Sequence, residues 1–246
     1  MSVAERCLRF DGVSKRFGGT LAVVEVSATV AAGEVYGLIG PNGSGKTTLM
    51  NLVSGFYAVD AGSIVLNGQH LERRRAHEMA ALGVVRSFQL PRAFASLSVF
   101  DNLLVPATAD HRRESLAAVR ERAIQALAWT GLDQHAAALA STLSGGQTML
   151  LQLARSMMHE PLHLLLLDEP FAGVALAIKE RMIDIIRRLN RERGATTLLV
   201  SHEMTTIRQL CTRVGVMNAG RLIAEGSLAD VAERPEVIEA YLGKPV

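Results

Sequence analysis

Residues 40–47 read GPNGSGKT and directly follow the apolar run Val35–Ile39. The stretch matches the pattern G-x-x-x-x-G-K-[ST] of phosphate-binding loops. Glycines permit backbone conformations that other residues avoid, so successive N–H groups can turn inward around phosphate oxygens. A buried strand is predicted before the loop and a helix after it, which is the context that the pattern requires. This strand–loop–helix unit predicts an α/β fold and a bound nucleoside triphosphate, rather than a glycine-rich turn that matches by accident.

The charged and hydroxyl side chains of this loop have separate expected tasks. Lys46 would neutralise the β- and γ-phosphates, and Thr47 would supply a hydroxyl to Mg²⁺. The following helix aims the positive end of its dipole at the same phosphates. The predicted nucleotide-binding residues of this stretch are Gly40, Pro41, Asn42, Gly43, Ser44, Gly45, Lys46, Thr47 and Thr48.

A pair of carboxylates follows a second buried strand. Asp168 and Glu169 come directly after the run Leu164–Leu167, and open α/β sheets bind ligands at the carboxyl ends of their strands. Asp168 is predicted to hold Mg²⁺, directly or through a water, and Glu169 to polarise the attacking water as general base. An acidic pair alone is more typical of a helix cap or a surface turn. Beside a phosphate loop, the catalytic interpretation is favoured.

Length and composition exclude several classes of protein. The 246 residues carry a formal net charge of +2, and the basic clusters Arg73–Arg75 and Arg112–Arg113 have no interleaved aromatic residues. We therefore predict solvated helix faces and no nucleic-acid partner. The apolar runs are far shorter than the roughly 20 residues that cross a bilayer, and residues 1–12 are charged where a secretory signal is apolar. A cytoplasmic protein is expected.

The two cysteines suggest neither a metal site nor a disulfide. Cys7 and Cys211 are far apart in the sequence and have no His or Cys neighbour at metal-ligand spacing. Both are predicted to be buried thiols.

Alternating strand and helix signals predict a parallel sheet covered by helices. Leu162–Leu167 and Thr196–Val200 are short apolar runs without polar alternation, as expected of strands buried on both faces. Val23–Ala31 and Ser63–Leu66 are predicted strands near turns, and the Asn67–Gly68 pair is a hairpin signal. These features indicate a small antiparallel part near the N-terminus.

A helical insertion is predicted between Pro91 and Pro161, because strand signals are absent there and Ser115–Leu127 has apolar residues at helical spacing. The chain is therefore predicted to form a single domain over residues 1–246. Its nucleotide-binding core, a P-loop NTPase core, would comprise residues 1–89 and 162–246, and residues 90–161 would form a helical subdomain.

A third motif identifies a family resemblance. Residues 143–147 read LSGGQ, directly before the helical run Met149–Met158. Together with the phosphate loop, the stretch LLLLDEP at 164–170 and His202 after the run TLLV, this motif makes the chain resemble the ATP-binding subunits of ABC transporters. The four motifs occur in the family's order and cover nearly the whole chain.

The resemblance implies further site residues. Ser144 and the N–H groups of Gly145 and Gly146, with Gln147, would close the ATP site of an opposite subunit. Gln89 would contact Mg²⁺ and the attacking water, and His202 would contact the γ-phosphate. Phe17 occupies the place of the aromatic residue that stacks on adenine; the alternative is a core phenylalanine in a strand.

Shorter segments narrow the resemblance to one subfamily. The segments RFGG, GVVRSFQ, LDEPFAGV and PEVIEAYLG are similar to those of ATP-binding subunits that serve branched-chain amino acid importers and their relatives for urea and other small amides. LDEPFAGV and the ending YLG are also similar to the ATPase of lipopolysaccharide export, which remains the alternative within the transporter class.

The chain departs from the family pattern at two places. Ala175 and Leu176 stand where the family usually has Asp or Asn, often followed by Pro in this subfamily. That polar side chain helps to couple the two ATP sites, so slower or less coordinated hydrolysis is expected. Thr148, Met149 and Leu150 replace the basic residues that often follow LSGGQ, and this difference is consistent with helix packing.

The resemblance also implies partners. A second ATP-binding subunit, either the same chain or a paralogue, would complete an ATP-sandwich dimer. Separate transmembrane permease subunits would dock near Gln89 and Leu90–Leu104, with an extracytoplasmic solute-binding protein acting indirectly, which places the chain peripherally on the inner face of the cell membrane.

Two other classes of function are less favoured. Soluble ABC ATPases that act on nucleic acid or ribosomes usually have tandem domains or a long coiled coil, which this sequence lacks. A non-hydrolytic regulatory subunit would be supported only by the change at Ala175 and Leu176.

Overall fold

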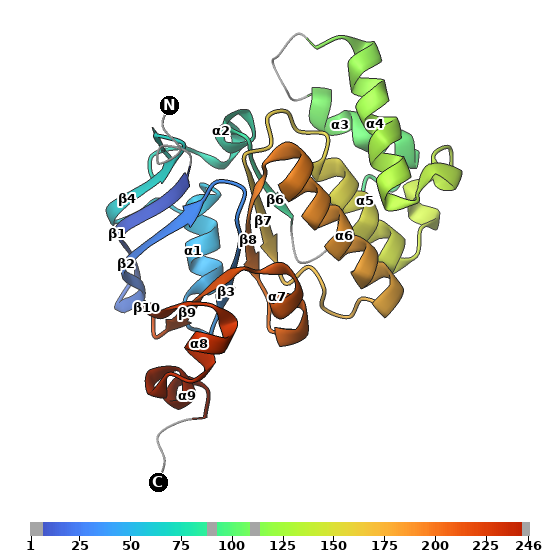
Figure 1. Ribbon diagram of the computed structural model, residues 1–246. Coiled ribbons are helices and arrows are strands. Elements are labelled where there is room, and N and C mark those ends of the chain that lie inside the picture. The colour runs from blue at the N-terminus through green and yellow to red at the C-terminus, as the bar shows by residue number, and fades with distance from the viewer. Residues whose placement is uncertain (1–6, 88–92, 109–113, 243–246) are drawn as a thin grey trace.

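The computed structural model describes residues 7–87, 93–108 and 114–242. Two sheets lie on either side of helix α1 (Lys46–Val53), and further helices cover the opposite face of the larger sheet (Figure 1). This arrangement confirms the predicted α/β class with an antiparallel part formed by the N-terminal region.

The smaller sheet is antiparallel and has the strand order β2-β1-β4-β5. Its strands are β1 (Cys7–Phe17), β2 (Thr20–Ala31), β4 (Ala61–Leu66) and β5 (Gln69–His70). Asn67 and Gly68 connect β4 to β5 with φ values of 51° and 79°. Positive φ at both central residues is what a tight hairpin turn requires, so the predicted hairpin is confirmed.

The larger sheet has the order β10-β9-β3-β8-β7-β6 and is parallel except for the edge pair β9–β10. Its strands are β3 (Val35–Ile39), β6 (Val84–Ser87), β7 (Leu164–Asp168), β8 (Thr196–Val200), β9 (Arg213–Asn218) and β10 (Arg221–Gly226). Every residue of β3, β7 and β8 is buried. The apolar runs without alternation therefore form the central strands, as predicted.

Successive residues of the central strands contribute to two different apolar clusters. Leu164 and Leu166 pack with α1 and the antiparallel sheet, whereas Leu165 and Leu167 pack with helices on the other face. This alternation follows from the two-residue period of a strand. Helix α1 is thus fixed between the two sheets, and its first residue, Lys46, is fixed with it.

Over its described residues the segment between β6 and β7 consists of helices joined by turns and loops, with an isolated bridge between Ser98 and Leu139. It contains α3 (Val99–Thr108), α4 (Leu116–Thr130) and α5 (Gly145–Ser156), with short 3₁₀ helices at Asp133–His135 and Ala140–Thr142. Ser115 caps α4, because its hydroxyl accepts the N–H of Ala118 at 3.2 Å. Helix α5 begins inside the LSGGQ motif, four residues earlier than the predicted run, because Ser144 is its N-cap.

The remaining helices lie between β5 and β6 or after β7 in the chain. They are α2 (Ala76–Met79), a 3₁₀ helix at Ala80–Leu82, α6 (Leu176–Arg193), α7 (Met204–Leu210), α8 (Leu228–Ala232) and α9 (Pro235–Leu242). Within the described ranges, none of the helices combines the length and the apolar character that a bilayer-spanning helix needs.

Two smaller predictions have mixed outcomes. Arg73–Arg75 are exposed but precede α2 instead of lying on a helix face, and Arg112–Arg113 lie outside the described residues. Cys211 is partly buried, and burial raises the pKa of its thiol to about 12, so the thiol stays protonated at neutral pH. The structure does not describe the side chain of Cys7.

Candidate nucleotide site

A pocket of about 680 Å³ lies at the carboxyl ends of the central strands β3, β7 and β8. This is where open α/β sheets bind their ligands. The residues that line it are Thr20, Leu21, Ala22, Asn42, Gly43, Ser44, Gly45, Lys46, Thr47, Thr48, Asp168, Glu169, Val200, His202, Ala219 and Gly220. The fold therefore brings the phosphate loop, the acidic pair and His202 to one pocket.

The phosphate loop has the backbone that its glycines make possible. Gly43 and Gly45 have φ values of 77° and 104°, in the left-handed region where a side chain is strained. A Cβ atom on Gly45 would lie 2.4 Å from the carbonyl oxygen of Ala22. The loop is therefore packed against β2 so closely that only glycine fits at this position.

Replacing Gly45 by alanine should disrupt the loop. Gly45→Ala adds a backbone clash to an unfavourable φ, and we expect a loss of roughly 1–3 kcal/mol in the free energy of unfolding together with weaker nucleotide binding. Thermal melting and titration with a fluorescent ATP analogue measure the two effects. Gly43→Ala is the matched control, because φ is also positive there but no atom of the described residues lies within 4 Å of the added Cβ. Equal effects of the two substitutions would contradict the steric explanation.

Lys46 is buried at the base of the pocket. Its ammonium donates to the carbonyl oxygens of Gly40 at 2.8 Å and Pro41 at 2.9 Å, and to the hydroxyl of Ser44 at 3.4 Å. Burial lowers the pKa of Lys46, while the charges of Glu169 and Asp168 oppose that shift. Gly40 and Pro41 thus act on Lys46 and do not line the pocket.

Glu169 and His202 form a pair across the ends of β7 and β8. The backbone N–H of His202 donates to Oε2 of Glu169 at 3.2 Å, and the ring Nε2 lies 3.3 Å from Oε1. Glu169 also has a φ of 50°, unusual for a residue with a side chain, and its own N–H donates to Val200 at 2.9 Å. Burial raises the pKa of Glu169, with contacts to His202 acting in the opposite direction. The carboxylate is therefore held in a strained, specific place, as expected of a functional residue.

The pocket offers the donors that Mg²⁺ prefers. The hydroxyl of Thr47 and the carboxylate of Asp168 are oxygen donors that line the same pocket, and Mg²⁺ is usually bound by one or two carboxylates together with substrate phosphates. Oε1 of Glu169 is buried and lies 3.3 Å from Nε2 of His202, and it accepts no hydrogen bond from the residues that the structure describes. The residues present fit a nucleotide with its divalent cation.

The LSGGQ residues form a separate, exposed helix terminus. The hydroxyl of Ser144 accepts the N–H of Gln147 at 3.3 Å, and the Gln147 side chain accepts the N–H of Ser144 at 2.9 Å. The Gln147 amide also lies 3.0 Å from the ring of His135. Ser144 and Gly145 are exposed, and none of Ser144, Gly145, Gly146 and Gln147 lines the pocket of the phosphate loop. These residues therefore do not act on the nucleotide pocket of their own chain in this structure.

Of two further predicted site residues, the structure describes Phe17 but not Gln89. Phe17 is 41% exposed at the end of β1 and contacts Tyr57 edge-to-face, with ring centroids 5.0 Å apart. It is not a core residue, and it lies beside Thr20, its register partner, which lines the pocket. Gln89 lies outside the described residues.

Ala175 and Leu176 lie at the start of α6. Ala175 is the N-cap and supplies no side-chain hydrogen bond, and Leu176 is 69% exposed. Ala175 therefore supplies no polar side chain where the resemblance implies one, and Leu176 presents an apolar side chain to solvent.

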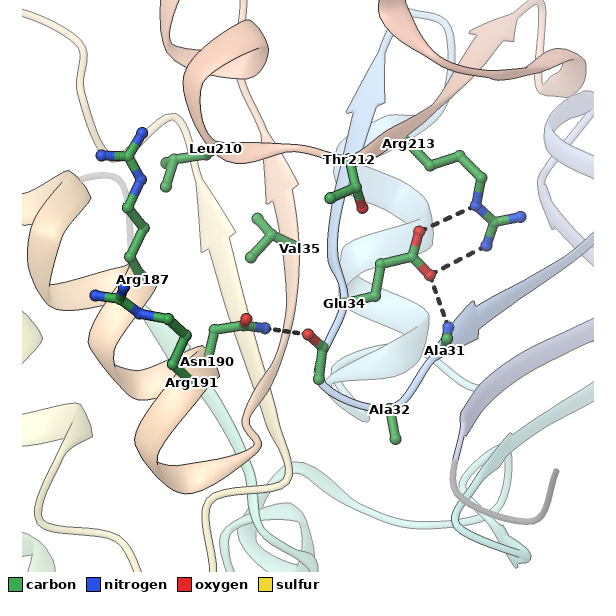
Figure 2. A pocket seen from close by; sticks show the side chains of 11 residues that line it. Ala31, Ala32, Glu34, Val35, Arg187, Asn190, Arg191, Leu210, Thr212 and Arg213 are labelled. Atoms are coloured by element: carbon green, nitrogen blue, oxygen red, sulfur yellow. Dashed lines mark hydrogen bonds and ion pairs between the residues drawn. The ribbon is translucent and has the colours of Figure 1, made fainter. Parts of the chain in front are cut away.

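A second cavity of about 550 Å³ lies at the opposite end of the sheet. Figure 2 shows the Glu34 carboxylate between the Arg213 guanidinium and the N–H of Ala31, with Asn190 donating to the Gly33 carbonyl. The cavity is lined by the first residues of β3 and β9, so it lies away from the strand ends that hold the phosphate loop. Among its polar side chains, Arg213 pairs with Glu34, and Asn190 and Arg187 connect α6 to the backbone carbonyls of Gly33 and Gln209.

Sequence reasoning missed part of the pocket wall and one contact of Asp168. Thr20, Leu21 and Ala22 from β2, with Ala219 and Gly220 from the β9–β10 turn, line the pocket, and these residues carry no motif. Arg86 donates to Oδ2 of Asp168 at 3.1 Å. Arg86 lies in the segment GVVRSFQ, but only the pairing of β6 with β7 places it beside Asp168.

Known proteins resemble the chain over nearly its whole length. The family model for ABC transporters matches residues 23–172, and the model for branched-chain amino acid ATP-binding cassette transporters matches residues 221–246. The high-affinity branched-chain amino acid transport ATP-binding protein LivG of Escherichia coli (strain K12) is 36% identical, covering 98% of this chain and 100% of LivG. The corresponding BraF of Pseudomonas aeruginosa is 36% identical, covering 96% of this chain and 98% of BraF. The crystal structure of the ADP conformation of MJ1267, an ATP-binding cassette of an ABC transporter, has a TM-score of 0.84 at 29% identity and covers 97% of this chain and 99% of that one.

Proposed function

Because the chain belongs to the ABC transporter family, in which it is an ATP-hydrolysing, nucleotide-binding subunit, we propose that it powers the uptake of branched-chain amino acids or related small amides. The observation that supports ATP hydrolysis is the contact between Glu169 and His202, which line the same pocket as Lys46. The names of LivG and BraF support the solute class, and the match at residues 221–246 favours this group over lipopolysaccharide export.

Hydrolysis is assigned to named side chains. Glu169 accepts a proton from the attacking water, because its carboxylate lines the nucleotide pocket and burial raises its pKa. His202 holds Glu169 in place and contacts the γ-phosphate, and Lys46 stabilises the charge that develops on the transferred group. Phe17 stacks on adenine from the β1–β2 hairpin, and its exposed ring is consistent with that task.

Thr47, Asp168 and Gln89 are the proposed ligands of Mg²⁺. Bound there, the ion would neutralise charge on the β- and γ-phosphates. The support from the described residues is that Thr47 and Asp168 line one pocket and are both oxygen donors.

Two ATP-binding subunits are proposed to enclose the nucleotides. The exposed start of α5 presents Ser144 with the N–H groups of Gly145 and Gly146, and a helix N-terminus suits an anion. Since these residues do not line the pocket of their own chain, their ATP would belong to the partner subunit. Closure on ATP would move the membrane subunits, and hydrolysis would reopen the dimer.

The permease is proposed to dock beside the helical segment. A cleft of about 440 Å³ lies there, and its wall includes Phe94, which is 46% exposed and stacks with Arg155 at 5.0 Å. Its lining residues Arg86 and Ala93 flank in the sequence the stretch that contains Gln89. In this proposal residues 1–89 and 162–246 bind the nucleotide, residues 90–161 form the helical subdomain, and the subunit works on the inner face of the cell membrane.

Uptake of labelled leucine tests the proposed solute class. A strain without this gene should lose high-affinity uptake, and the wild-type gene should restore it while Lys46→Ala should not, because that variant lacks the buried ammonium of the phosphate loop. Uptake of an unrelated sugar is the control. If the deleted strain takes up leucine normally but fails to export lipopolysaccharide, the chain is assigned to the lipid exporters instead.

A further inference from the structure

Arg86 joins the acidic end of β7 to the helix that begins at the phosphate loop. Its Nη2 donates to Oδ2 of Asp168 at 3.1 Å, and its Nη1 donates to Asn51 Oδ1 at 2.5 Å and to the Ser54 hydroxyl at 3.0 Å. Asn51 lies in the second turn of α1, and Ser54 is its C-cap. The Arg86 guanidinium thus contacts both β7 and α1, and each of these elements contributes residues to the nucleotide pocket.

Strand register explains this placement. Arg86 pairs with Leu166 across the parallel β6–β7 ladder, so Asp168, two residues beyond Leu166, projects from the same face of the sheet. That face is covered by α1. The side chains of Arg86 and Asp168 are each only 10% exposed, so water screens their interaction poorly.

The contacts with α1 fix the guanidinium itself. Arginine is planar and presents its donors in a rigid fork, so simultaneous bonds to Asn51, Ser54 and Asp168 define its orientation. Its charge also lies at the C-terminus of α1, where a cation is favourable. Asp168 lines the nucleotide pocket, and its carboxylate is therefore held by a group whose own position is determined by α1.

We propose that Arg86 is a positioning residue that orients the Asp168 carboxylate and thereby sets the affinity of the nucleotide site for its divalent cation. This inference rests on the proposed role of Asp168 as a ligand of Mg²⁺. Side chains that orient metal ligands affect metal affinity without touching the metal. A purely structural Arg86 would instead affect the stability of the fold and leave the metal dependence of nucleotide binding unchanged.

The test compares nucleotide affinity with and without Mg²⁺. A fluorescent ATP analogue is titrated against the full chain in EDTA and in Mg²⁺, and the ratio of the two dissociation constants gives the enhancement by the metal. Arg86→Met should reduce that enhancement about tenfold, the lower end of the effect of losing a group that orients a metal ligand. Affinity in EDTA should stay at the wild-type value, because the phosphate loop is unchanged.

Arg213→Lys is the matched control. Arg213, the first residue of β9, also pairs with a carboxylate, that of Glu34 just before β3, with Nε 3.0 Å from Oε1 (Figure 2), but it lies at the opposite end of the sheet. This variant should melt at a lower temperature and keep the wild-type enhancement by Mg²⁺. If Arg86→Met does not fold, Arg86→Lys and Asn51→Ala carry the test, since each weakens the fork while keeping a cation.

The outcomes separate this inference from the proposed function. A wild-type enhancement that persists in the variants at Arg86 and Asn51 overturns the positioning role and leaves the proposed function intact. A wild-type chain that binds the analogue equally well in EDTA and in Mg²⁺ contradicts the proposed metal site itself, and the inference fails with it.

Discussion

Glu169→Gln should lower the rate of ATP hydrolysis by roughly 10²–10⁴-fold, the usual contribution of a general base. Glutamine keeps the size of the side chain but cannot accept the proton of the attacking water. ATP binding should persist, because Lys46 and the phosphate loop are unchanged, and ATP should accumulate in the undissociated dimer. Phosphate release measures the rate, and size-exclusion chromatography with ATP measures the dimer.

Glu203→Gln is the control for this substitution. Glu203 is a neighbouring carboxylate that pairs with Lys179 at 2.5 Å and does not line the nucleotide pocket. Its replacement should leave turnover near the wild-type rate. Normal turnover in Glu169→Gln would exclude Glu169 as the base, and equal losses in both variants would indicate a general disturbance of this end of the sheet.

The phosphate loop and the central strands were predictable because their signals are local. A loop pattern needs only its own glycines, and a strand buried on both faces needs only a short apolar run; the predicted ranges Val35–Ile39 and Thr196–Val200 coincide with β3 and β8. The hairpin at Asn67–Gly68 was equally readable, since the two residues carry the positive φ values themselves.

The unpredicted features depend on contacts between distant segments. Arg86 meets Asp168 only because β6 pairs with β7 in one particular register, and no spacing in the sequence encodes that register. The β2 residues that line the pocket are also brought there by contacts between distant segments. Ala22 approaches Gly45 because the antiparallel sheet packs on the phosphate loop. The helical run alone places the start of α5 too late, at Met149, whereas the resemblance implies a helix N-terminus at Ser144–Gly146, where the structure has it.

Ser144→Arg should lower the rate of hydrolysis by orders of magnitude while the single chain still binds ATP. An arginine at the exposed start of α5 would remove the hydroxyl and obstruct the N–H groups that are proposed to meet the partner's γ-phosphate. Loss of such donors costs roughly 10²–10³-fold in rate. Binding should survive, because Ser144 does not line the pocket of its own chain. Phosphate release and titration with a fluorescent ATP analogue measure the two quantities.

Ser115→Arg separates this effect from the loss of a helix cap. Ser115 caps α4 as Ser144 caps α5, by accepting an N–H three residues on, so both substitutions should reduce stability by roughly 1 kcal/mol. Only Ser144→Arg should lower the rate of hydrolysis by orders of magnitude. A comparable loss of ATP binding in isolated Ser144→Arg chains would instead mean that α5 acts on the nucleotide of its own subunit. Mixing Ser144→Arg chains with Lys46→Ala chains extends the test. In a mixed dimer, the intact phosphate loop of the Ser144→Arg chain faces the intact α5 terminus of the Lys46→Ala chain. If the mixture releases phosphate faster than either variant alone, the phosphate loop of one subunit acts together with the α5 terminus of the other.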